Sequence, residues 1–188
     1  MLVPTQSVLI VTGPPGAGKS TVSRLVAGQH EQGVCIESDW FWSTIVNGFI
    51  SPWESESDHQ NHIVLRSFVA ATSAFAQGGY PVVLDAVVGP WYLDLVTEEL
   101  KGTEVEVHYV VLRPSLPVAL ARATGRSNMK ERVPGHGHLV DEDPVRSMWE
   151  RFSNLGGHER FVIDTSDLDP EQTAALVWER FRAGDFRL

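Results

Sequence analysis

The sequence predicts an α/β domain built on a parallel β-sheet, and two observations support this fold class. Short apolar segments rich in β-branched residues, such as 81–85 and 107–112, alternate with segments whose apolar residues recur at helical spacing. These short segments are apolar almost throughout, as expected for strands that helices cover on both faces. In such a sheet the ligand is expected beyond the carboxyl ends of the strands.

The elements are expected in a regular order along the chain. Strands are predicted at 7–12, 33–37, 81–86, 104–112 and 160–164. Helices are predicted at 19–29, across a long region from about 39 to 78, and at 91–100, 115–126, 141–155 and 170–182. A loop rich in Gly, Pro and His is expected around 127–140. No repeat or linker interrupts this order, so residues 1–188 are expected to form one domain.

Composition excludes some classes of function. The net charge of −9 argues against a general nucleic-acid-binding or anionic-membrane surface, and no nucleic-acid or membrane partner is expected. Cys35 is the single cysteine, so no internal disulfide can form, and we expect it to pack as a small apolar residue. No signal-like segment or apolar run of about 18 residues is present, which favours a cytoplasmic setting.

The most informative motif is Gly-Pro-Pro-Gly-Ala-Gly-Lys-Ser at 13–20, which matches G-x-x-x-x-G-K-[ST]. It follows the predicted strand 7–12 and precedes the predicted helix 19–29, the context that a phosphate-binding loop (P-loop) requires. The residues expected to bind nucleotide phosphates are Gly13, Pro14, Pro15, Gly16, Ala17, Gly18, Lys19, Ser20 and Thr21. Lys19 is predicted to contact the β- and γ-phosphates of ATP, and the Ser20 hydroxyl to ligate Mg²⁺.

Two carboxylates end predicted strands. Asp85 closes Val-Val-Leu-Asp at 82–85, the form of a Walker B element, and is predicted to bind Mg²⁺ and border the substrate. Asp39 closes the second strand and is predicted to orient an acceptor hydroxyl and accept its proton. The alternatives are a simple strand terminus for Asp85 and a helix N-cap for Asp39.

A second set of candidates lies in the C-terminal half. Thr165 and Ser166 follow the last predicted strand, where a P-loop fold places the adenine base, although they could simply form a cap and turn. Arg122, Arg126 and Arg132 surround the start of the loop 127–140. Arg122 is predicted to contact ATP, and Arg126 and Arg132 to stabilise transition-state charge from a flap at about 122–142; solvent-exposed positions are the alternative.

Together these motifs resemble the small P-loop kinases, and most of all the group of chloramphenicol phosphotransferase, gluconate kinase and zeta toxin. The resemblance spans almost the whole chain and implies the strand order 2-3-1-4-5, a flap over ATP, and an acceptor held by the region after the second strand. Asp39 matches the position of the proposed base in the chloramphenicol enzyme and the toxins. The acceptor region does not match any one member, so the substrate is not implied.

The acceptor region, about 38–80, can be examined for charge instead. From 38 to 65 it contains no Lys or Arg but has four carboxylates and several aromatic residues. Trp40 and Phe41 are expected to lie on opposite sides of a helix. An apolar, acidic wall suits a neutral or cationic organic molecule better than an anion, which kinases normally bind with arginine. The residues predicted to contact the acceptor are Asp39, Trp40, Trp42, Trp53, His62, Arg66 and Asp85.

The sequence therefore predicts an ATP- and Mg²⁺-dependent phosphotransferase that acts on a hydroxyl of a small antibiotic-like or sugar-like molecule. A kinase of nucleotides or nucleotide sugars, of the zeta-toxin type, is one alternative, and a nucleotide-dependent switch that is not a kinase is another. The pairs His59/His62 and His136/His138 lack a third ligand and predict zinc only weakly.

Overall fold

The computed structural model describes residues 6–101, 103–125 and 142–188. Its centre is a five-stranded parallel sheet in the order β2-β3-β1-β4-β5, which confirms the predicted fold class and strand order. The strands are β1 (Ser7–Thr12), β2 (Val34–Glu37), β3 (Val82–Asp85), β4 (Glu106–Leu112) and β5 (Val162–Ile163).

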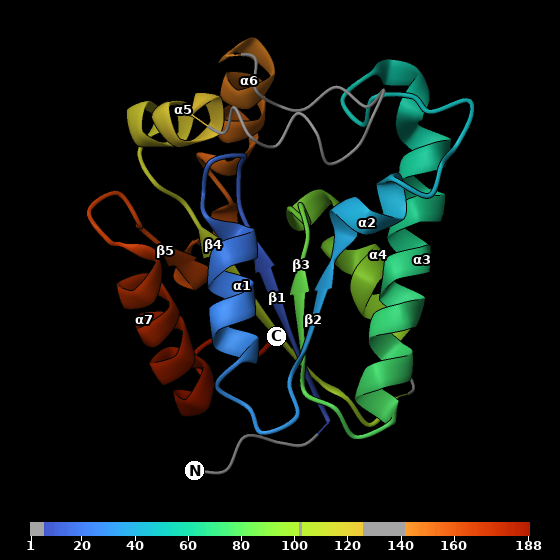
Figure 1. Ribbon diagram of the computed structural model, residues 1–188, viewed down its shortest axis with the longest axis vertical. Coiled ribbons are helices and arrows are strands. Elements are labelled where there is room, and N and C mark those ends of the chain that lie inside the picture. Colours follow the sequence, from blue (N-terminus) through green and yellow to red (C-terminus); the bar gives the residue numbers. More distant parts are fainter. Residues whose placement is uncertain (1–5, 102, 126–141) are drawn as a thin grey trace.

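Helices cover the sheet on both sides (Figure 1). They are α1 (Lys19–Ala27), α2 (Ser38–Trp42), α3 (Asp58–Gln77), α4 (Pro90–Leu100), α5 (Leu116–Thr124), α6 (Glu142–Phe152) and α7 (Pro170–Ala183). Helices α1 and α7 pack together on one face, and α3 and α4 pack together on the other. Helices α5 and α6 lie together beyond the carboxyl ends of the strands, at the top of Figure 1.

The core lies along the central strands. Every residue of β1 and of β3 is buried, because each of these strands has a strand on both sides and helices on both faces. The last strand, β5, pairs only with Val111 and Leu112 of β4. The C-terminal residues pair antiparallel with the other half of β4, where the Tyr109 N–H donates to the Phe186 carbonyl at 2.8 Å.

The long helical region predicted from 39 to 78 is wrong in its middle part. Helix α2 ends at Trp42 and α3 begins at Asp58, with only the short 3₁₀ helix η1 (Ser55–Ser57) between them. Gly48 takes a positive φ of 75° in this connection. The Gln60 side chain accepts from the Ile50 N–H at 2.9 Å and donates to its carbonyl at 2.6 Å. These side-chain bonds take the place of a helical backbone ladder.

The last strand is also shorter than predicted. Residues Gly156–Phe161 form a 3₁₀ helix, η3, so β5 contains only Val162 and Ile163. The Phe161 side chain is buried in the core, and this turn brings it there. Within the part of the chain that is described, no helix is both long enough and apolar enough to cross a membrane.

Candidate active site

The segment 13–20 forms a loop between β1 and α1 in which three glycines have positive φ. A Cβ atom on Gly13 would meet the Leu112 carbonyl oxygen at 2.1 Å, and one on Gly16 would meet the Ala119 carbonyl oxygen at 2.1 Å. Side chains at these two positions would therefore force the loop away from β4 and α5. Gly18, with φ of 89°, has no atom within 4 Å of its Cβ position. The loop therefore packs closely against β4 at Gly13 and against α5 at Gly16, whereas the space beside Gly18 is open.

The first turn of α1 is suited to bind an anion. Its N-cap is Gly18, which provides no side-chain cap, and the turn carries no acidic residue. The backbone N–H groups of this turn can therefore bind an oxyanion, and the helix dipole favours negative charge there. The Lys19 ammonium lies over the loop and donates to the carbonyl oxygens of Gly13 at 3.0 Å and Pro14 at 3.2 Å. These residues fit the phosphates of a nucleoside triphosphate.

Asp85 ends β3 beside this loop. Its side chain is buried, and the sheet register places it next to Val11 on one side and Glu37 on the other. Burial raises the pKa of Asp85, whereas the Lys19 charge and a hydrogen bond from Ser20 lower it; the Asp39 and Glu37 carboxylates raise it further. Ser20 and Asp85 thus lie close together, and their hard oxygen atoms are of the kind that Mg²⁺ prefers.

The prediction that Asp39 closes the second strand is wrong, because β2 ends at Glu37 and Asp39 lies on the five-residue helix α2 that follows. The N-cap of this helix is Glu37, so Asp39 is not its cap either. It is exposed, and its charge acts on Asp85. The expectation for its neighbours is confirmed: Trp40 is 60% exposed, whereas Phe41 packs against the core with its ring 6.1 Å from that of Phe68. Asp39 and Asp85 therefore form one group of carboxylates, in which Asp39 is exposed to solvent and Asp85 is buried.

Sequence reasoning missed the role of Glu37. This residue is opposite Asp85 in the sheet and forms an ion pair with Arg24 of α1, whose Nε lies 2.6 Å from the Glu37 Oε1. Only the position of Glu37 at the end of a predicted strand could have indicated this pair. The guanidinium of Arg24 balances one of the three carboxylates that surround the end of β3.

The candidate residues for the base of the nucleotide lie together at the other end of the site. The Arg122 guanidinium donates to the carbonyl oxygens of Thr165, Ser166 and Leu168 at 3.1 to 3.4 Å. The Ser166 hydroxyl donates to Asp164 at 2.5 Å and accepts from the Ser115 N–H at 2.9 Å. The hydrogen bond from the Ser166 hydroxyl lowers the pKa of Asp164. The loop after β5 is therefore held in a defined conformation, and Arg122 is one of the residues that hold it.

Two of the predicted acceptor residues lie where α3 meets α4. The Arg66 guanidinium forms an ion pair with Glu99 of α4 at 2.8 Å, and the His62 ring lies 5.8 Å from that of Tyr92. His62 is also 3.9 Å from Asp58. The Trp42 ring meets Phe49 edge to face at 6.5 Å, while Trp53 is 37% exposed. The structure thus brings Lys19, Ser20, Asp39 and Asp85 together, but shows His62 and Arg66 engaged with α4.

Other predictions lie outside the described residues: Arg126, Arg132, His136, His138 and most of the proposed flap. Within the described ranges, no cluster of three or more His, Cys, Asp or Glu side chains could hold a metal ion. Cys35 is half-buried and packs against the core, and burial raises the pKa of its thiol to about 12.

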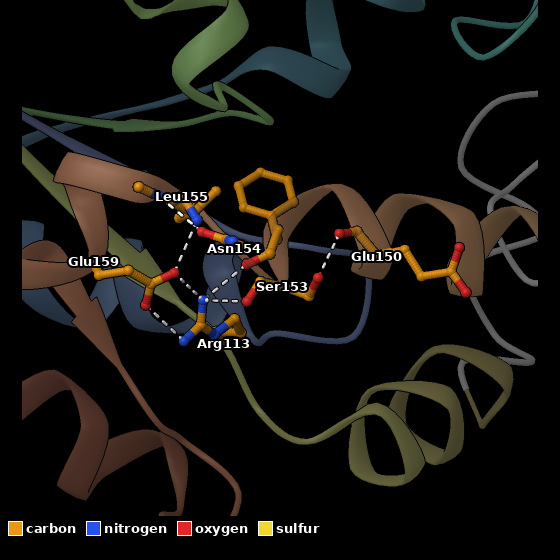
Figure 2. A network of polar contacts seen from close by, with 8 residues as sticks. Arg113, Glu150, Ser153, Asn154, Leu155 and Glu159 are labelled. Atoms are coloured by element: carbon orange, nitrogen blue, oxygen red, sulfur yellow. Dashed lines mark hydrogen bonds and ion pairs between the residues drawn. The ribbon is translucent and has the colours of Figure 1, made fainter.

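A further polar network, which the sequence did not predict, anchors the end of α6 (Figure 2). Arg113 follows β4 and donates to both carboxylate oxygens of Glu159 at 2.9 Å and to the carbonyl oxygen of Phe152 at 2.9 Å. The Trp149 indole donates to the Pro114 carbonyl at 2.8 Å. The Arg151 guanidinium lies 3.9 Å from the centre of the Trp91 ring at the start of α4. Helix α6 is therefore attached both to the sheet and to α4.

This fold and loop define a P-loop protein with the architecture of the small P-loop kinases. A family profile described as AAA domain, AAA_33, matches residues 8–155, and the chain belongs to this family. Over 80 residues it is also 32% identical to 2-isopropylmalate synthase from Xanthomonas oryzae pv. oryzae. That match covers 39% of this chain and only 15% of the synthase.

Solved structures of two kinases and of a resistance protein have the same fold. A sugar kinase from Janibacter is similar with a TM-score of 0.64 and 22% identity, covering 97% of this chain and 99% of that one. Shikimate kinase from Acinetobacter baumannii has a TM-score of 0.64 and 18% identity, covering 95% and 94%. The tunicamycin resistance protein of Deinococcus radiodurans has a TM-score of 0.64 and 15% identity, covering 97% and 98%.

Proposed function

We propose that this protein transfers the γ-phosphoryl group of ATP to a hydroxyl group of a small neutral or cationic molecule. The observation that supports this most directly is the convergence of a P-loop with two carboxylates at the carboxyl ends of neighbouring strands. Lys19 and Ser20 follow β1, Asp85 ends β3, and Asp39 follows β2. Phosphoryl transfer needs a cradle for the triphosphate, a cation-binding group and a group that orients the acceptor, and these residues can provide them.

Each residue has a distinct part in this proposal. The N–H groups of the loop and of the first turn of α1 bind the phosphates, and Lys19 moves from the loop carbonyls to the β- and γ-oxygens. Ser20 and Asp85 would hold Mg²⁺, which neutralises charge on the phosphates when it is bound. Asp39 is exposed on the acceptor side, so it suits the role of a base that takes the proton from the acceptor hydroxyl. Asp85 is buried beside the P-loop, so it suits the role of a metal ligand better than that of the base that takes the proton of the acceptor.

The charge of the acceptor region supports an acceptor that is not an anion. Residues 38–65 contain no Lys or Arg. Arg66, the first arginine after them, is paired with Glu99. An anion bound beside Asp39 would lose hydration without gaining a cationic partner, at a cost of several kcal/mol.

The exposed apolar side chains of the same region support an organic acceptor. Trp40, Val46, Trp53 and Ile63 are all exposed between α2 and the first turns of α3. An ammonium group could interact with an exposed indole such as that of Trp40 or Trp53. The similarity in fold to a sugar kinase and to a tunicamycin resistance protein is consistent with an acceptor that is a sugar or an antibiotic.

A panel of acceptors tests this proposal. ADP release would be measured with ATP and Mg²⁺ in the presence of neutral polyols and sugars, amino sugars and choline, and the anions gluconate, shikimate and a nucleoside monophosphate. The proposal expects stimulation by members of the first two groups, with the phosphorylated product identified by ³¹P NMR. A preference for one of the anions would overturn the acceptor class.

The same panel separates the alternative functions. A nucleotide sugar is added to the panel for this purpose, and its phosphorylation alone would favour the toxin-like kinase. ATP hydrolysis that no acceptor stimulates would favour a nucleotide-dependent switch, and in both cases the proposed substrate class would be abandoned. The Lys19→Ala variant serves as the control for contaminating kinases, because it removes the charge that contacts the phosphates.

A further inference from the structure

The segment 86–89, between β3 and α4, is here called the post-β3 loop, and the backbone N–H and carbonyl of one of its residues are held by two buried side chains. The Val88 N–H donates to the Thr12 Oγ1 at 2.9 Å. The Val88 carbonyl accepts from the Tyr109 hydroxyl at 2.8 Å. Val88, Thr12 and Tyr109 are all 0% exposed, so both bonds are shielded from water.

The two anchors come from different strands. Thr12 is the last residue of β1 and directly precedes Gly13 of the P-loop, whereas Tyr109 lies on β4. Since β1 lies between β3 and β4, the Tyr109 hydroxyl contacts this loop from the side of β1 opposite to β3. One further bond, from the Ala86 N–H to the Val11 carbonyl at 3.3 Å, continues the pairing of β3 with β1 past Asp85. The loop is thus fixed to both of the strands that support the P-loop.

We propose that Thr12 and Tyr109 are positioning residues that hold the post-β3 loop, and through it the Asp85 carboxylate, in place relative to the P-loop. This inference rests on the proposed function, in which Ser20 and Asp85 share a metal ion. Ser20 lies in the first turn of α1, which the P-loop connects to β1, while Asp85 lies on β3, so their separation depends on how the two segments are joined. Thr12 joins them directly, because it borders Gly13 and also bonds to the post-β3 loop.

The hydroxyl groups of Thr12 and Tyr109 can each be removed by a substitution that keeps the packing of the rest of the side chain. Thr12 could be replaced by the isosteric Val without loss of volume, and Tyr109 by Phe without loss of its ring contacts with Phe161, at 5.7 Å, and His158, at 6.2 Å. Thr12→Val leaves the Val88 N–H buried without this acceptor, and Tyr109→Phe leaves the Val88 carbonyl buried without this donor. The loop can recover that bond only by moving toward water, and Asp85 would move with it.

The test measures binding rather than turnover. The affinity for a non-hydrolysable ATP analogue is determined by calorimetry with Mg²⁺ and with EDTA, and the ratio of the two affinities gives the gain due to the metal. We expect Thr12→Val and Tyr109→Phe each to reduce this gain about tenfold, as is usual when a group that orients a metal ligand is lost. The affinity in EDTA should change by less than about twofold, and Thr12→Ser, which keeps the hydroxyl, should retain the gain.

Thr72→Val is the matched control. Thr72 is also 0% exposed, but its hydroxyl donates to the Phe68 carbonyl within α3 at 2.8 Å. It should lower the thermal midpoint while leaving the metal-dependent gain unchanged. The double variant Thr12→Val/Tyr109→Phe should lose less than the product of the single losses, since both hydroxyls bond to the backbone of one residue, Val88.

Two results would overturn the inference. If Thr12→Val and Tyr109→Phe lower the thermal midpoint as Thr72→Val does but keep the full gain, the two hydroxyls only support the fold. If Thr12→Val does not fold, Tyr109→Phe alone decides the question by the same ratio. If the wild-type protein binds the analogue without any gain from Mg²⁺, the metal assignment in the proposed function fails together with the inference. A full gain in the wild type and in both variants would instead reject only the positioning role of Thr12 and Tyr109.

Discussion

Replacement of Arg113 by Met tests whether the network at the end of α6 stabilises the protein. The Arg113–Glu159 pair is partly exposed, so its two bonds contribute about 1 kcal/mol. The bond to the carbonyl of Phe152, a residue that is itself buried, comes from a charged donor, and its loss costs about 2 kcal/mol more. The free energy of unfolding should therefore fall by about 3 kcal/mol, with a decrease of roughly 6–12 °C in the thermal midpoint.

Urea denaturation followed by circular dichroism measures this change, and two variants make it specific. Glu159→Gln removes the charge but keeps an acceptor for the Leu155 N–H, so it should cost about 1 kcal/mol. Lys101→Met breaks an exposed pair with Glu98, which solvent screens, and should change the free energy of unfolding very little. A loss for Arg113→Met no larger than that of Lys101→Met would refute the reasoning that the network carries the stability of this region.

The dependence of this effect on pH has a definite sign. Hydrogen bonds from Arg113 lower the pKa of Glu159 below its ordinary value of 4.5. The stability due to the pair is therefore fully present above pH 4.5 and is lost as the pH falls through the lowered pKa. The difference in unfolding free energy between the wild type and Arg113→Met should shrink in that acidic range, and a difference that is constant with pH would contradict the ion-pair contribution.

Three further predictions concern the proposed active site. Lys19→Ala should fold normally but lose several kcal/mol of transition-state stabilisation, and near wild-type ADP release from the folded variant would reject the role of Lys19. Asp85→Asn should require more Mg²⁺ for half-maximal activity. Because burial raises the pKa of Asp85 above 3.8, the metal-free wild type should also lose stability as the pH rises through that raised pKa, a loss that Asp85→Asn should not show in chemical denaturation. Asp39→Asn should leave ATP affinity unchanged and lower turnover about 10²-fold or more; a parallel fall in ATP affinity would instead indicate a structural role.

The sequence alone determined the fold class and the phosphate-binding half of the site. Both depend on short-range signals: the apolar segments around 7–12 and 82–85 have the composition of buried strands, and the glycines of 13–20 are spaced as a P-loop requires. The sequence also indicated that Asp39 and Asp85 lie at the carboxyl ends of neighbouring strands, because parallel strands present these ends at one edge of the sheet; Asp39, however, lies in α2 directly after β2 and not in the strand itself.

The tertiary structure decided which partners the polar side chains take, since these lie far apart in the chain. The Thr12 hydroxyl bonds to Val88, 76 residues away, and Arg113 bonds to Glu159, 46 residues away. No local pattern marks such pairs, because a threonine at a strand end and an arginine in a loop are compatible with many environments. The connection between α2 and α3 is likewise held by the bonds from the Gln60 side chain to the backbone of Ile50, which the helical spacing of apolar residues did not indicate.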